Sequence, residues 1–418
     1  MHISKLHTTL LLLLCQIIML GQTDKGVYLE NNGSALSEAY NFPNNIKVIG
    51  FGAYHGSAKT EDAELLLLTS LINKNNLRYY FAETDISIAF YFNEYLKTGD
   101  EVLLKDLIET YGTRVPQERT IEVVTKWKKI KAMNDKLPKN KRIQVLGADP
   151  IVTYKYTYRH LISLINKPKL WPAALRLQKT IAKDTTDFSP YYDSYSKMQL
   201  KDFVSDYEAD AVKYESYINN KPLFDHLIHI LKISFSDGYK REKEMYNNYL
   251  TVSKIFNCKD KTQFFRLGFS HLLKAKQPDE KSGSFFSMII DSKMYSKNEI
   301  ISITGYLTKS SVIWKDKYDK DGEYTHSTTN SDVGTGDSES EYFRGIDDFK
   351  SQQKSDLTIF NLNTPQSPYS ETSCTDMVEV VTKDNPVMPG NSTTTDFIDY
   401  ALLISNSPAS RSIYSLKK

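Results

Sequence analysis

Two apolar, β-type runs are each followed directly by a glycine-containing turn that ends in a histidine. "VIGFGAYHG" places His55 three residues after Gly52, and "FFRLGFSH" places His271 three residues after Gly268. Glycine allows a sharp turn and a close approach of a ligand to the backbone. Imidazole takes and returns a proton near neutral pH, and it is also a common metal ligand. The pattern therefore predicts two histidines with a chemical role.

Carboxylates end two further β-type runs. Glu83 closes "LRYYFAE" and Asp149 closes "RIQVLGAD". A carboxylate beside a histidine can fix its tautomer and stabilise its charged form, which serves general base catalysis. Two imidazoles and one carboxylate are equally the composition of a metal site. Secondary candidates for the same site are Tyr54, Glu61, Glu64, Asp85 and Asp149.

The elements that must position these residues alternate between strands and helices. Strands are expected at 46–52, 77–83 and 142–149, and amphipathic helices at 60–75 and 120–134. Connections of this length imply parallel pairing in an α/β sheet. Ligands of such sheets bind beyond the carboxyl ends of the strands, where both histidines and both carboxylates would converge. The predicted fold class is α/β, with a central, mainly parallel sheet flanked by helices.

The rest of the chain extends this single domain, which we place at residues 22–418. Residues 155–255 hold no convincing strand pattern and are expected to form a large helical layer. β-type runs return at 263–271, 300–308, 357–363 and 399–406. Between them, residues 316–341 are rich in Gly, Ser, Thr and Asp, which predicts a flexible polar loop.

The N-terminus has the pattern of a secretory signal peptide over residues 1–21. A basic start precedes an apolar run from Leu10 to Leu20, which is too short to span a bilayer comfortably. We expect an exported protein, periplasmic or extracellular, with no stable membrane span after cleavage. Cys258 and Cys374 then remain, either paired or as buried free thiols. The formal net charge of +2 gives no indication of nucleic-acid binding.

Several enzyme classes lack their motifs in this sequence. No G-x-S-x-G elbow of an α/β-hydrolase is present. No phosphate-binding loop, no G-x-G-x-x-G after a strand and no H-E-x-x-H occurs.

The run from Ile46 to Asp149 resembles the erythromycin esterase family. The resemblance is carried by "GAYHG", "YFAET", "FNEYLKTGD", "KWKKIKAMN" and "IQVLGAD", and later by "KREKEMYNNYL", "FFRLGFSH" and "FIDYALLISN". It implies that His55 is a general base that activates water, without a cofactor. It implies that Glu83 and His271 hold the water or polarise the ester carbonyl, and that Arg241 lies near the site.

The same turns also resemble a wider superfamily that contains the TIKI/TraB proteins and ChaN. In the first branch the resemblance implies a peptidase with a divalent metal on His55, Glu83 and His271. In the ChaN branch it implies haem-iron binding without catalysis.

Two positions depart from the esterase pattern. Gly52 stands where the esterases have glutamate, and Glu64 stands where they have arginine. The departures argue against macrolide esterase activity, and Gly52 makes the turn more like that of the metal branch. The leading expectation is an exported hydrolase that cleaves an ester, lactone or amide of a small molecule or peptide. The metal-dependent peptidase and a non-catalytic small-molecule or haem-binding protein are the alternatives.

Overall fold

The computed structural model describes residues 24–183, 187–236, 238–276, 283–318, 324–329, 335–372, 374–381 and 392–417. The predicted signal peptide at 1–21 lies outside these residues.

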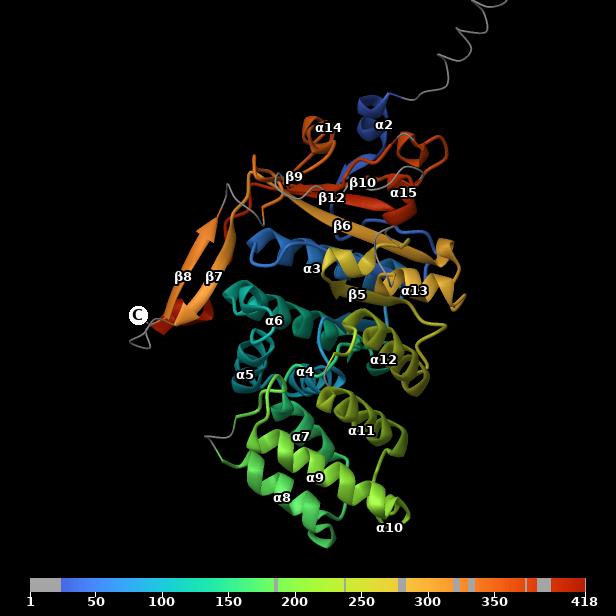
Figure 1. The fold of residues 1–418 in the computed structure, drawn as a ribbon. Coiled ribbons are helices and arrows are strands. Elements are labelled where there is room, and N and C mark those ends of the chain that lie inside the picture. The colour runs from blue at the N-terminus through green and yellow to red at the C-terminus, as the bar shows by residue number, and fades with distance from the viewer. Residues whose placement is uncertain are drawn as a thin grey trace, which may run out of the picture.

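The described chain is built around an eight-stranded sheet (Figure 1). Its strands lie in the order β1 (Gly33–Ala35), β10 (Leu357–Asn361), β12 (Tyr400–Ser405), β6 (Ile300–Thr308), β2 (Val48–Gly52), β5 (Gln263–Leu267), β3 (Tyr79–Ala82) and β4 (Gln144–Gly147). The six strands from β12 to β4 are parallel, and β10 runs antiparallel to both of its neighbours. The predicted α/β fold with a mainly parallel sheet is confirmed.

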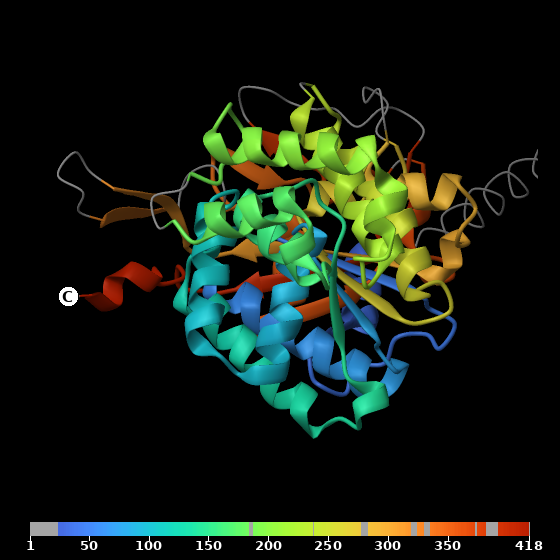
Figure 2. The same ribbon diagram turned by 90° about the horizontal axis from the view of Figure 1, so that it is seen from below.

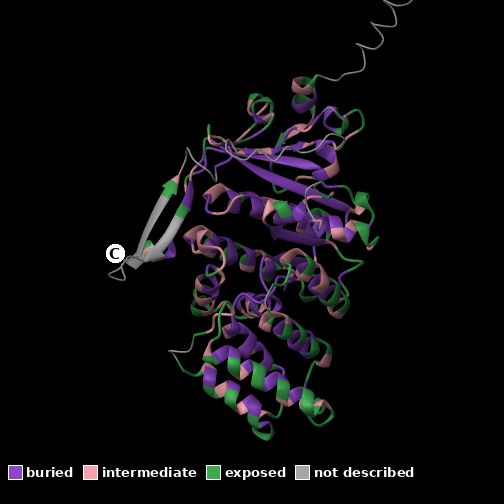
Figure 3. Ribbon diagram, in the orientation of Figure 1, coloured by how far each residue is buried: buried purple, intermediate pink, exposed green. Residues whose placement is uncertain are grey.

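Helices cover both faces of the sheet because the central strands are apolar on both sides. Successive residues of a strand point to opposite faces. On one face Tyr80 packs against Trp127 of α6 (Ile121–Lys136). Helix α6 in turn packs beside α3 (Ala58–Asn75). On the other face Phe81 packs against Tyr249 of α12 (Arg241–Phe256), which lies beside α13 (Phe285–Asp291). Figure 3 shows the buried residues gathered along the strands.

A helical layer extends the fold beyond the β4 edge (Figures 1 and 2). It consists of α7 (Tyr154–Ser163), α8 (Pro172–Ile181), α9 (Tyr195–Ala209), α10 (Ala211–Glu215) and α11 (Lys221–Phe235). Its core surrounds Trp171, which stacks on Tyr214 and Phe203. The layer joins the sheet through α7, which packs on α4 (Ile86–Thr98) next to β4. Helix α5 (Glu101–Tyr111) follows α4.

The range 316–341, predicted to be a loop, contains regular structure. β7 (Val312–Tyr318) and β8 (Tyr324–Thr329) form an antiparallel hairpin, and β9 (Glu341–Phe343) pairs with β11 (Glu379–Val381). The loop prediction is wrong for these strands. The Tyr and Thr residues of "YTHSTT" favour β-structure, whereas the polar composition of the segment by itself predicts a loop.

Near the β1 edge lie α2 (Lys25–Asn32), α14 (Ile346–Ser351) and α15 (Thr394–Phe397) (Figure 1). Cys258 and Cys374 are both buried and free, which decides between the two expected states of these thiols. Among the helices of the described residues, none is both long enough and apolar enough to cross a membrane.

Candidate functional site

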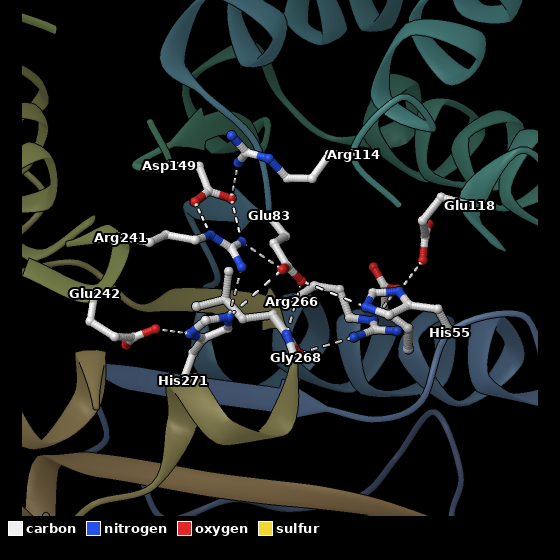
Figure 4. A network of polar contacts seen from close by, with 12 residues as sticks. His55, Glu83, Arg114, Glu118, Asp149, Arg241, Glu242, Arg266, Gly268 and His271 are labelled. Atoms are coloured by element: carbon white, nitrogen blue, oxygen red, sulfur yellow. Dashed lines mark hydrogen bonds and ion pairs between the residues drawn. The ribbon is translucent and has the colours of Figure 1, made fainter. Parts of the chain in front are cut away.

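Four neighbouring parallel strands end at one edge of the sheet, and each delivers a polar residue there. His55 follows β2, Glu83 follows β3 directly, and Asp149 follows β4. His271 lies in the short helix η4 (Phe269–Leu272), which continues β5. Arg241, the first residue of α12, reaches the same place from the side (Figure 4). The structure therefore brings together all four residues of the predicted centre and also Asp149.

Glu83 lies at the middle of this polar network and is buried. Its Oε1 accepts a hydrogen bond from Nη2 of Arg241 at 2.7 Å, and its Oε2 accepts one from the backbone N–H of Gly268 at 2.9 Å. Nε2 of His55 lies 3.8 Å from Oε2, and Nε2 of His271 lies 3.8 Å from Oε1. Burial opposes ionisation, but His55, Arg241 and His271 hold the pKa of Glu83 below its ordinary value. The carboxylate is thus charged at neutral pH.

A second carboxylate stands behind each histidine. Nδ1 of His55 lies 2.5 Å from Oε1 of Glu118, which ends the short helix η1 (Pro116–Glu118). Nδ1 of His271 hydrogen-bonds Glu242, the second residue of α12. Each imidazole is therefore held through Nδ1 and directs Nε2 toward Glu83.

In each pair the hydrogen bond shifts the pKa of one partner against the effect of burial. Although burial works against ionisation, the hydrogen bond to His55 lowers the pKa of Glu118 to about 2. Burial likewise opposes the charge of His271, but the hydrogen bond to Glu242 raises the pKa of this histidine above its ordinary value.

Neither of these glutamates is among the site residues predicted from the sequence. Glu242 lies inside the quoted segment "KREKEMYNNYL" and could have been found from its place beside Arg241. Glu118 belongs to no recognisable motif, and only the path of the chain between α5 and α6 brings it to His55.

Asp149 anchors Arg241 through two parallel hydrogen bonds. Nε and Nη2 of Arg241 donate to Oδ1 and Oδ2 of Asp149, each at 2.9 Å. Nη1 of Arg114 lies 2.9 Å from Oδ2, and Nη2 of Arg114 donates to the carbonyl oxygen of Pro150 at 3.0 Å. Burial raises the pKa of Asp149, but the positive charges of Arg114 and Arg241 outweigh this effect and lower it. The Arg241 guanidinium, bound to both Asp149 and Glu83, is fixed in position.

Asp85 lies outside the polar network. Its Oδ1 accepts hydrogen bonds from the backbone N–H groups of Ser87 and Ile88 at the start of α4, and its Oδ2 accepts one from Val152. This is the N-cap arrangement of a helix. Burial raises the pKa of Asp85 to about 6. Asp85 therefore joins two chain segments and does not face the histidines.

Glu61 and Glu64 belong to a separate buried charge cluster on α3. Nζ of Lys126 lies 2.5 Å from Glu61 and 2.8 Å from Glu64. Glu64 also accepts a hydrogen bond from Tyr80 and lies 3.3 Å from Nε of Arg266. Burial raises the pKa of Glu61 to about 7. Lys126 and Arg266 of this cluster are close enough to Glu118 to contribute to the lowering of its pKa.

Packing explains why position 52 is glycine. A Cβ at Gly52 would lie 2.4 Å from Cα of Phe269, so the two histidine turns touch through backbone at this point. The glutamate of the esterase pattern has no room there. Glu118 supplies a carboxylate to His55 from another segment of the chain.

Tyr54 turns away from the histidines. Its hydroxyl donates a hydrogen bond to Glu379 at 2.7 Å and also contacts Glu341, and its ring lies against Phe269 and Phe343. Burial raises the pKa of Tyr54. The structure therefore places this secondary candidate in the contact between η4 and β9.

The alternative assignment requires a metal ion on His55, Glu83 and His271. Within the described ranges, no group of three or more His, Cys, Asp or Glu side chains is arranged to hold one. Both oxygens of Glu83 already accept hydrogen bonds, and the Arg241 guanidinium lies 2.7 Å from Glu83 and 3.2 Å from Nε2 of His271. A fixed positive charge at that place repels a cation. The residues as arranged do not fit a metal site.

Comparison with known proteins shows relatives of the fold alone. No family model and no curated protein matches the sequence. A protein from Bacillus cereus has a similar solved structure, with a TM-score of 0.62 and 14% identity over 93% of this chain and 98% of that chain. A succinoglycan biosynthesis protein has the same TM-score and identity, over 93% and 97% of the two chains. An erythromycin esterase mutant, EreC, in its open conformation has a TM-score of 0.56 and 12% identity, over 88% and 93%.

Proposed function

We propose that this protein is a hydrolase in which His55 activates a water molecule to cleave an ester, lactone or amide. The observation that carries the proposal is the position of His55 between two carboxylates. Glu118 binds Nδ1 at 2.5 Å, and Oε2 of Glu83 lies 3.8 Å from Nε2. A carboxylate at Nδ1 keeps the proton on that nitrogen and leaves the lone pair of Nε2 available as a base.

The spacing between His55 and Glu83 suits a shared water. A separation of 3.8 Å between Nε2 and Oε2 is too long for a direct hydrogen bond. One water molecule at about 2.8 Å from each atom can contact both of them. Glu83 would orient this water while His55 takes its proton. The side chain of His55 is 21% exposed and that of Arg241 is 34% exposed, so a substrate can reach them.

In the proposed reaction the water oxygen attacks the carbonyl carbon while Nε2 of His55 accepts the water proton. The negative charge that develops on the carbonyl oxygen faces Arg241 and His271. Both of these side chains lie near Oε1 of Glu83, whereas the water lies near Oε2. The fixed positive charge of the Arg241 guanidinium stabilises the tetrahedral intermediate at this position. The bond to the leaving oxygen or nitrogen then breaks, and the leaving group takes the proton from His55.

The structural similarity to an erythromycin esterase mutant supports the hydrolase class. We place the activity outside the cytoplasm, because the basic and apolar N-terminus has the pattern of a signal peptide. Analysis of the N-terminal residue of the exported protein tests this part of the proposal.

The test is hydrolysis of a panel of p-nitrophenyl esters, aliphatic lactones and anilides by the purified protein. We expect His55→Ala to lower kcat by about three orders of magnitude or more, since the base is removed. His229→Ala is the matched control, because His229 is exposed on α11. Equal turnover by the protein and by folded His55→Ala would refute the proposal. Absence of turnover across the panel would instead favour a non-catalytic binding protein.

A further inference from the structure

A cavity of about 230 Å³ lies beside the turn that carries His271, and residues next to His271 in the chain line it. Phe269 and Ser270 of η4 form one wall, and Tyr306 of β6, Phe343 and Ile398 form much of the rest. Concave sites with mostly apolar walls and a few polar groups are typical of small-molecule binding. The volume suits a compact molecule.

Two carboxylates stand on the cavity wall, and they differ in their partners. Asp376 is neutralised by Nζ of Lys25 at 2.6 Å. Glu379 accepts a hydrogen bond from Tyr54 at 2.7 Å, and no lysine, arginine or histidine of the described residues forms an ion pair with it. A half-buried carboxylate of this kind lacks a positive partner that a ligand could supply.

We propose that this cavity binds a compact amine, with its ring or alkyl body against the aromatic walls and its ammonium group on Glu379. The aromatic faces of Phe343 and Tyr306, which lie with their ring centroids 4.6 Å apart, suit an apolar body and also attract a cation. The site is distinct from the His55–Glu83 network, so the proposal does not depend on the hydrolase activity.

The pH dependence of binding follows from Glu379. Burial, together with Glu341, raises the pKa of Glu379 to about 7. An ammonium ion binds the ionised carboxylate, so the amine must displace a proton below this pH. Affinity for the amine is therefore expected to rise between about pH 6 and pH 8.

The experiment is calorimetric titration of the purified protein with 2-phenylethylamine and with its neutral counterpart 2-phenylethanol. At about pH 8 we expect the amine to bind about tenfold more tightly than the alcohol. Glu379→Gln should lower amine affinity about tenfold and leave alcohol affinity unchanged. The matched control Asp347→Asn removes a carboxylate whose side chain is 89% exposed, and it should change neither affinity.

A second variant keeps the proposal testable if Glu379→Gln disturbs the contact with Tyr54. Ser270 is exposed and lines the cavity, so Ser270→Trp should block it and abolish binding of both probes. Lack of amine binding, equal affinities for amine and alcohol, or full binding by folded Ser270→Trp would each overturn the proposal.

Discussion

Nδ1 of His55 donates a hydrogen bond to Oε1 of Glu118 over 2.5 Å, although 63 residues separate the two in the chain. The pair gives the proposed base its tautomer and its orientation. Glu242 holds His271 in the same way on the other side of Glu83. Two carboxylate-held imidazoles thus direct Nε2 toward one central carboxylate.

Glu118→Gln is expected to lower kcat by about two to four orders of magnitude, because the amide no longer fixes the tautomer or stabilises the imidazolium. Steady-state kinetics on the best substrate of the hydrolysis panel measures this change. Glu109→Gln on α5 is the control, since its partially exposed side chain pairs only weakly with Lys105 at 4.0 Å. Equal kcat for the two variants would show that Glu118 has no part in the reaction.

The glycines of the two histidine turns are expected to respond differently to alanine. At Gly52 a Cβ would lie 2.4 Å from Cα of Phe269, whereas at Gly268 the nearest atom is Cδ2 of His271 at 3.5 Å. Gly52→Ala should therefore lower the free energy of unfolding by about 2 kcal/mol or more, and Gly268→Ala by less than about 1 kcal/mol. Urea denaturation measures both values. Similar losses for the two variants would contradict the close packing of the turns.

Arg241 is shared by two buried carboxylates, Glu83 and Asp149. Arg241→Ala leaves Glu83 without its closest cation and should lower the free energy of unfolding by about 3 kcal/mol. Arg159→Ala, which removes a partly exposed arginine whose Nη1 lies 3.8 Å from Asp106, should cost about 0–1 kcal/mol. Chemical denaturation of both variants beside the unmodified protein gives the comparison. A loss for Arg241→Ala as small as that for Arg159→Ala would contradict this role.

The stability of the protein should depend on pH through His271 and Glu242. Because the pKa of His271 is raised in the folded state, the pair contributes fully below the unfolded pKa of about 6.5. The contribution is lost as pH rises through the folded value. Glu242→Gln should therefore reduce the free energy of unfolding more at about pH 6 than at about pH 9. Denaturation across this range tests the prediction, and a deficit independent of pH would contradict it.

Glu118 should affect the stability of the protein at acidic pH. Its pKa is lowered to about 2, so its contribution is present above the unfolded pKa of about 4.3 and is lost as pH falls toward 2.

Removal of metal ions should leave hydrolysis unchanged. The Arg241 guanidinium lies 2.7 Å from Glu83. A metal ion bound at this place would need the same carboxylate as a ligand. Dialysis against a chelator, with elemental analysis before and after, is expected to change neither the metal content nor kcat. Stoichiometric metal that is lost together with activity would support the metal-dependent peptidase instead.

Local sequence patterns were sufficient for the parallel strands and for the residues at their ends. Apolar runs followed by Gly, His, Glu or Asp predict both the strand and its polar end, because parallel strands present their carboxyl ends at one edge of the sheet. Polar β-strands were not predictable in the same way. The hairpin of β7 and β8 was missed because low hydrophobicity resembles that of a loop, although its Tyr and Thr residues favour strands.

Short-range periodicity and turn residues are enough to predict the α/β sheet and the candidates His55, Glu83 and His271. Which charged side chains contact one another depends on the folded arrangement of distant segments. This arrangement pairs Glu118 with His55, assigns Asp85 to a helix cap, and moves Glu61 and Glu64 into a separate cluster with Lys126. Buried charges are stable only beside a partner, and such partners come from segments distant in sequence that no local pattern connects.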